Sequence, residues 1–159
     1  AFDNPGGPLF ELEDDDIKAG LRASRTSERL RMILPIHRKQ DAEVQRIVNF
    51  VQPGTYIRPH RHPLPHATES IIVLKGRIHF LIFENDGSLK YDKVLSSKPI
   101  PGIIDIEPLV WHSFWVLEED TILFECKKGP YDATADKEFA EWSPSEGSPE
   151  AAGWIHKFI

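Results

Sequence analysis

Short runs of apolar and β-branched residues fill the chain from Gly54 to Lys128, with Gly, Pro, Asn and Asp between them. β-Branched and aromatic side chains favour extended backbone and the intervening residues favour turns, so these runs predict strands. Regular short strands indicate an all-β sandwich or barrel. The segment ENDGS at residues 84–88 predicts a hairpin turn, since Asn and Gly tolerate positive φ. The predicted strands are 55–62, 69–76, 77–84, 89–96, 102–108, 111–118 and 121–128.

Two segments before Gly54 predict short helices that pack outside the barrel. The acids at residues 14–16 suit a helix N-terminus, and this helix is expected to end near Ser24. In DAEVQRIVNFV, residues 41–51, Asp41 is a candidate N-cap for a second helix. The residues between the two helices, LRMILPIH at 30–37, are expected to be extended. Apolar residues recur at helical spacing in both segments, at Ile17, Leu21 and Ala23 and at Val44, Ile47, Val48 and Val51.

A length of 159 residues fits one domain. We expect an N-terminal arm, helices and leading strand at 1–53, a barrel core at 54–128, and a tail at 129–159 that wraps the barrel. The formal net charge of −6 argues against nucleic-acid or anionic-membrane binding. Cys126 is the only cysteine, which excludes an intrachain disulfide framework and a cysteine-cluster zinc site. With no long apolar run and no signal pattern, a cytoplasmic protein is the simplest expectation.

Three histidines and a glutamate form the candidate metal site. His60 and His62 are two positions apart on a predicted strand, so their imidazoles share one face and suit a divalent metal. Glu69 opens the next strand and is expected as a third ligand, with a hydrogen-bonding role as the alternative. His112 begins a later aromatic-rich strand and supplies a fourth. A polar network lining the barrel without metal is the competing interpretation.

These residues also lie in motifs that resemble those of the cupins. The pattern from Gly54 through His60, His62 and Glu69 to Gly76 is similar to the first cupin motif, and residues 102–112 resemble the second. Six residues separate His62 from Glu69, where cupins usually have three or four. The longer loop makes His66 a rival ligand.

A closer resemblance, from about Leu21 to Gly147, is to the WbuC family of small cupin-fold metalloproteins. It is carried by YIRPHRHP, IVLKGRI, VWHS and LFECKKGPYDATADKEFAEWSPSEG, and His37 also looks like a family position. The resemblance implies an all-β cupin (double-stranded β-helix, or jelly-roll barrel) with a metal in its mouth. It also implies an association with surface-polysaccharide genes.

Several other side chains have two interpretations each. Tyr56 and Arg58 share the parity of His60 and His62, so they are expected either to bind substrate or to form a buried structural contact. Lys127 and Lys128 are either a basic rim or a solvated strand end. The remaining expectations are His79 and Cys126 as packed residues, Trp111 and Trp115 as outer packing or a subunit interface rather than sugar-stacking platforms, and Phe114 and Val116 as inward-facing. His37 is expected to hydrogen-bond either a ligand or a neighbouring strand.

Three imidazoles and one carboxylate suit zinc, iron, nickel, manganese or cobalt better than calcium or magnesium. Such a site permits isomerase, lyase, hydrolytic or oxygenase chemistry. The leading hypothesis is a metal-dependent enzyme acting on a small polar molecule, such as a sugar derivative in surface-polysaccharide metabolism. The alternatives are a non-catalytic ligand-binding or sensing module and a purely structural metal barrel. A homodimer is also expected, since cupins often dimerise.

Overall fold

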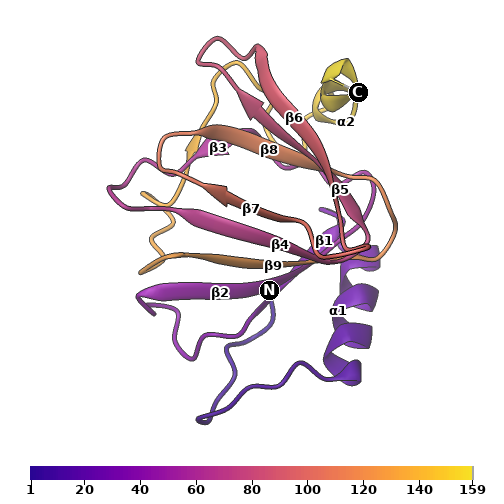
Figure 1. Cartoon of the computed structure of the whole chain (residues 1–159), viewed down its shortest axis with the longest axis vertical. Helices are drawn as coiled ribbons and strands as arrows, with labels where there is room; N and C mark the ends of the chain where they lie inside the picture. Colours follow the sequence, from indigo (N-terminus) through magenta and orange to yellow (C-terminus); the bar gives the residue numbers. More distant parts are fainter. Residues whose placement is uncertain (159) are drawn as a thin grey trace.

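The computed structural model describes residues 1–158, in which ten strands form two five-stranded antiparallel sheets. One sheet has the order β1-β2-β9-β4-β7 and the other has the order β10-β3-β8-β5-β6, and the two lie face to face (Figure 1). No helix in this part of the chain has the length and apolar character needed to cross a membrane. The strands are β1 (Arg31–Pro35), β2 (Val44–Val51), β3 (His60–Arg61), β4 (Glu69–Lys75), β5 (Arg77–Phe83), β6 (Leu89–Ser96), β7 (Ile103–Ile106), β8 (Trp111–Val116), β9 (Thr121–Lys128) and β10 (Glu138–Phe139).

Six of the strands expected after Gly54 and the extended segment before β2 are confirmed, the strand expected at 55–62 is reduced to β3 at His60–Arg61, and the predicted second helix is wrong. Residues 44–51 form β2, which lies between β1 and β9 with Val48 opposite Phe124. One face of β2 borders the interior cavity at Ile47, and the other packs Phe50 outward against a helix. A strand covered on both faces carries apolar residues at neighbouring positions, so it loses the alternation that identifies a strand.

The first predicted helix is confirmed as α1 (Asp14–Thr26), two residues longer than expected at its C-terminus. Glu13 and Asp16 form a capping box, in which each side chain accepts a hydrogen bond from the other's backbone N–H. The helix packs beside β1 and β2 (Figure 1). Gly20 permits this approach, because a Cβ atom there would lie 2.2 Å from the ring of Phe50.

Apolar side chains fill the space between the two sheets. Phe80, Val73 and Ile78 are fully buried there, and Phe114 and Val116 of β8 point into the same core, as predicted. These residues come from β4 and β8, which themselves carry candidate metal ligands, and from β5, which pairs with β8. The core therefore fixes the strand positions on which the site depends.

A second cluster fastens the C-terminal tail to the outside of β5 and β8. Trp154, in the short helix α2 (Ala151–Trp154) that continues as the 3₁₀ helix η1 (Ile155–Phe158), stacks on Trp142 with ring centroids 5.9 Å apart. Trp111 packs in this cluster and Trp115 packs against it, which confirms that both face away from the barrel interior. This part of the tail therefore packs on the outside of one sheet (Figure 1).

The hairpin predicted at ENDGS is confirmed between β5 and β6, where the backbone N–H of Glu84 donates to the carbonyl oxygen of Ser88. Gly87 in this turn has a φ of +84°, and a Cβ atom there would lie 2.8 Å from Trp142. We expect Gly87→Ala to lower the free energy of unfolding by about 1–2 kcal/mol, measured by urea denaturation. Gly6→Ala is the control, because nothing lies within 4 Å of its Cβ position. Equal stability of the two variants would contradict the prediction.

Candidate metal centre

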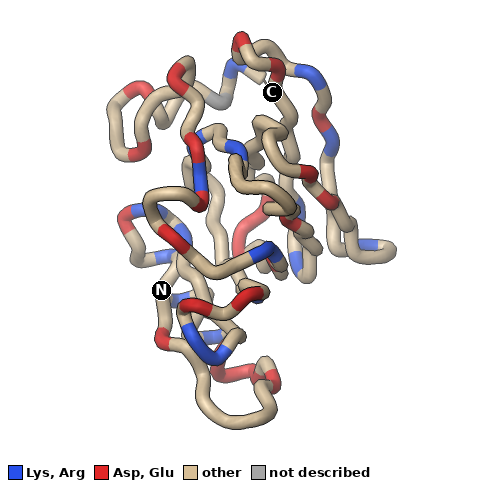
Figure 2. The backbone as a smooth tube through the Cα atoms, turned by 90° about the vertical axis from the view of Figure 1, so that its left-hand side faces the viewer, with Lys and Arg blue, Asp and Glu red and all other residues tan. Residues whose placement is uncertain are grey.

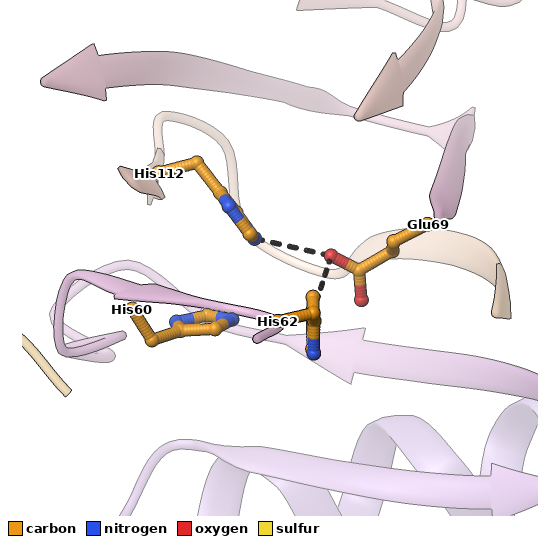
Figure 3. Close-up of side chains that lie close together, drawn as sticks. All are labelled: His60, His62, Glu69 and His112. Atoms are coloured by element: carbon orange, nitrogen blue, oxygen red, sulfur yellow. Dashed lines mark hydrogen bonds and ion pairs between the residues drawn. The ribbon is translucent and has the colours of Figure 1, made fainter. Parts of the chain in front are cut away.

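Three histidines and one glutamate meet between the two sheets (Figure 3). His60 begins β3, His62 follows it, Glu69 begins β4 and His112 lies in β8. All four are buried, and one potential ligand atom from each lies within 4.8 Å of the others. The residues expected to form the site are therefore brought together by the fold.

Strand pairing explains how residues so far apart in sequence converge. His60 and His112 are cross-strand partners on neighbouring strands of one sheet, with ring centroids 4.4 Å apart. Glu69 comes from the other sheet, where it lies opposite Lys127 of β9. The cluster thus bridges the two layers of the barrel at one end of the strands that carry it.

A backbone carbonyl oxygen lies within hydrogen-bonding distance of Nδ1 of each histidine. His60 Nδ1 is 2.9 Å from the oxygen of Arg58, and His112 Nδ1 is 2.9 Å from that of Val110. His62 Nδ1 is 2.6 Å from the oxygen of Asp136. A carbonyl only accepts, so each Nδ1 carries a proton, and Nε2 is the nitrogen of each ring that is left to bind a metal. Metal-binding histidines in proteins are oriented in the same way.

Glu69 is the negative centre of the cluster. Its Oε2 lies 3.1 Å from Nε2 of His112 and 3.4 Å from Nε2 of His62 (Figure 3). Burial by itself would raise the pKa of Glu69, but the contacts with His112 and His62 outweigh it and hold the pKa well below the usual range. Burial, followed by the charges of Lys137 and His112, lowers the pKa of His60 well below its usual value. The site therefore combines an ionised carboxylate with a neutral imidazole.

These residues fit a divalent transition metal. Bonds of about 2.0–2.2 Å place the donor atoms of one site about 3–4 Å apart, so the cluster needs only a small inward movement. Nε2 of His62 is buried and has no hydrogen-bond partner, which is costly for a site that only serves structure. Histidine nitrogen and carboxylate oxygen together suit zinc, iron, nickel, manganese or cobalt.

The cluster borders a cavity of about 490 Å³, which is within the range typical of small-ligand sites. His60, Glu69 and His112 line it together with side chains of β1, β2 and β9. A smaller cavity of about 240 Å³ reaches His62 beside Lys127 and Asp136. Figure 2 shows acidic and basic residues interspersed along the backbone in that view. The two cavities therefore provide space for a small ligand next to the cluster.

Comparison with known proteins places the chain in a family. The family model described as Domain of unknown function (DUF6016) matches residues 12–95, just over half of the chain. The chain belongs to this family. No curated protein matches the sequence of this DUF6016 member.

Solved structures similar to this DUF6016 protein have the cupin fold, which confirms the predicted fold class. Oxalate oxidase in complex with glycolate has a TM-score of 0.54 and 16% identity over 72% of this chain and 57% of its own. CapF, a capsular polysaccharide assembling protein from Staphylococcus aureus, has a TM-score of 0.56 and 18% identity over 69% and 30%. Oxalate decarboxylase from Bacillus subtilis has a TM-score of 0.52 and 13% identity over 69% and 27%. The chain therefore spans little more than half, or less, of these proteins.

The structure separates the two residues predicted to contact substrate. Arg58 borders the large cavity, as its parity with His60 predicted. Tyr56 lies instead in the aromatic cluster of the tail, where its hydroxyl donates to the carbonyl oxygen of Pro144 at 3.0 Å and burial raises its pKa to about 12. The alternation expected for these residues does not hold, because residues 55–59 form no regular strand. Tyr56 is thus placed for packing.

The other histidines lie outside the cluster. His66 is exposed in the loop before β4 with a φ of +61°. His37 is buried, and its Nδ1 contacts the backbone of Arg46, the neighbouring-strand contact that was one of its two expected roles. His79 pairs with Asp92 at 2.7 Å on the outer side of β5. Among the described histidines, only the predicted three contribute to the cluster.

Two charged residues of β9 border the cavities. Lys127 lines both cavities, which agrees with the basic rim among its two expected positions, and it is buried because it forms ion pairs with Asp136 at 2.8 Å and with Glu125 at 3.9 Å, whereas Lys128 is exposed. Glu125 borders the large cavity and accepts a hydrogen bond from Asn49. Burial, and then the charge of Glu69, raises the pKa of Glu125 to about 7. The signal for Glu125 was a carboxylate inside the apolar run TILFECKK.

Proposed function

We propose that this DUF6016 protein is a metal-dependent enzyme that acts on a small polar molecule. The observation that carries the proposal is the orientation of the three histidines, whose Nδ1 atoms face backbone carbonyls while Nε2 of His62 and His112 face Glu69. A structural ion-pair network would not need three imidazoles in the same tautomer beside a cavity. The proposed ligands are His60, His62, Glu69 and His112.

A divalent transition metal held there supplies a Lewis acid with a residual charge of about +1, which suits isomerase, lyase or oxygenase chemistry on an oxygen-rich substrate. The chain's own residues then bind and orient the substrate. Arg58 borders the cavity and is the proposed contact for an acidic or hydroxyl group. The apolar walls at Ile71 and Phe114 reduce water access around the bound molecule.

We propose a sugar derivative of surface-polysaccharide metabolism as the substrate and a cytoplasmic location. The resemblance to the WbuC family supports this choice, and CapF, with a similar fold, is a capsular polysaccharide assembling protein. Fold similarity at 18% identity carries no substrate by itself, so the proposal depends on the residues of the cavity.

The test begins with metal analysis of the protein purified without added metal, where we expect about one transition-metal ion per chain. Wild-type protein, chelator-treated protein and protein restored with each candidate metal are then compared in a turnover screen of sugar derivatives and small hydroxy acids. We expect turnover that chelation removes and one metal restores. Tight substrate binding without turnover would favour the ligand-binding or sensing alternative. Absence of metal binding by the folded protein would overturn the proposal.

A further inference from the structure

A group of three arginines and one glutamate lines the same large cavity as the metal cluster. Arg31 is the first residue of β1 and Arg29 lies just before it. Arg58 precedes β3, and Glu146 lies in the C-terminal tail. Arg29 Nη2 is 3.3 Å and Arg31 Nη2 is 2.6 Å from the same oxygen, Oε2 of Glu146. These four residues are called the arginine group below.

Positive charge exceeds negative charge in the arginine group. Arg58 donates only to neutral acceptors of the tail, the carbonyl oxygen of Ala140 at 2.9 Å and the hydroxyl oxygens of Ser143 at 3.2 Å and Ser145 at 3.4 Å. Glu146 is therefore the one carboxylate among the described residues that pairs with this group, and it contacts Arg29 and Arg31 but leaves Arg58 without a counter-charge.

The other acids of the cavity are already engaged by different partners. Glu69 contacts the histidines, while Glu125 and Asp136 pair with Lys127. Lys137, which also lines the cavity, adds further positive charge. No carboxylate that lines the cavity in the described part of the chain is left to balance the arginine group.

The excess of positive charge in the arginine group matters more where a guanidinium group is buried. The side chain of Arg31 is only 12% exposed, whereas that of Arg29 is 64% exposed. Its burial, and then the repulsion of Arg29, lower the pKa of Arg31 despite the nearby Glu146. Partly buried guanidinium groups with too few counter-charges favour the binding of an anion, and their flat donor arrays match carboxylate and phosphate oxygens.

The arginine group and the metal cluster are separated by a short distance along the cavity. Arg58 is two residues from His60, so their Cα atoms lie at most about 7 Å apart. The ring of Phe139 lies between them, 5.4 Å from the guanidinium carbon of Arg58 and 6.2 Å from the ring centroid of His60. A molecule of several bonded atoms is long enough to reach both.

We propose that the substrate carries two polar ends, with a carboxylate or phosphate bound by Arg29, Arg31 and Arg58 and a second oxygen group facing the His60–His112 cluster. This inference rests on the proposed function, because the second end requires the metal. In this arrangement Glu146 occupies part of the anion site and competes with the substrate. The anion-binding role thus falls to residues from two separate segments of the chain, Arg29 and Arg31 at the start of β1 and Arg58 before β3.

The test uses two pairs of probes that share one metal-binding end. Pyruvate and 2-oxoglutarate differ by a second carboxylate, and glycerate and 3-phosphoglycerate differ by a phosphate. Binding to the metal-loaded protein is measured by calorimetry. We expect the longer probe of at least one pair to bind about tenfold or more tightly than its partner. The pair with the larger difference identifies the anion that the site prefers.

Arg29→Gln and Arg58→Gln are each expected to weaken the favoured long probe about tenfold and to change its short partner less than twofold. Arg77→Gln is the matched control, because this arginine pairs with Glu118 on the surface and does not line the cavity. Glu146→Gln removes the competing carboxylate and is expected to strengthen binding of the long probe. A purely structural ion-pair group would not give these opposite signs.

Failure of this inference is distinguishable from failure of the proposed function. Metal binding with equal affinities for long and short probes, unchanged in the arginine variants, would overturn the two-ended substrate and leave the metal site intact. If no metal binds, inorganic phosphate is titrated into the metal-free protein, where Arg29→Gln and Arg58→Gln are expected to weaken phosphate about tenfold. Phosphate binding that neither variant changes would remove the anion site itself.

Discussion

His112→Ala is expected to lower the affinity of the protein for its transition metal by at least about 100-fold. Losing even a hydrogen-bond partner of a ligand costs about 10- to 100-fold, and His112 is itself one of four proposed ligands. The variant also removes the hydrogen-bond partner of Glu69 at 3.1 Å, which leaves the buried carboxylate less well compensated. Competition titration with a metal-binding dye measures the affinity.

His79→Ala is the matched control for this prediction. His79 is also a largely buried histidine on a strand, but its Nε2 contacts Asp92 and it lies outside the cluster. We expect the control to retain the metal affinity of the wild type within about threefold, well below the cost of disturbing a ligand's partner. If both variants bind metal as the wild type does, His112 is not a ligand and the proposed centre is wrong.

Phe50→Ala is expected to lower the free energy of unfolding by about 3–5 kcal/mol, the usual cost of removing a buried aromatic ring. Phe50 is fully buried and belongs to the cluster in which α1 packs on β2. The space left by the ring cannot be filled by Gly20, which has no side chain and lies directly beside it. Urea denaturation followed by circular dichroism gives the difference.

Leu74→Ala tests whether this loss depends on burial. Leu74 lies in β4 but is 44% exposed, so its truncation removes little apolar contact. We expect a change below about 1 kcal/mol for Leu74→Ala. A similar loss for both variants would mean that Phe50 does not anchor the helix to the sheet.

The sequence predicted strands best where only one face of the strand is buried, because the apolar residues then follow a single periodicity. The β-rich runs after Gly54 predicted β3 to β9, and the hairpin before β6 followed from Asn85 and Gly87. β2 was missed because its two faces meet different apolar surroundings, so its pattern contained two overlapping sets of buried positions. Its neighbours β1 and β9 could not be inferred from residues 44–51 alone, since strand pairing depends on the whole fold.

The four candidate ligands could be predicted from the sequence for a related reason. His60 and His62 share a strand face, and the cupin-like spacing led to Glu69 and His112, all of which the fold brings together. The surroundings were less predictable. Tyr56 turned away because the chain before β3 is irregular, and Glu146 reached the cavity from 115 residues beyond its partner Arg31. Contacts of that range have no local pattern from which they can be read.

Asp136 holds two parts of the centre at once. Its backbone oxygen fixes the ring of His62, and its carboxylate pairs with Lys127 at 2.8 Å, whereas His60 and His112 are oriented by carbonyls two residues before them. Two of the histidines are thus set by their own strands, and the third depends on a segment folded back from near the end of the chain. Metal affinity should consequently report whether the segment around Asp136 is packed against the barrel.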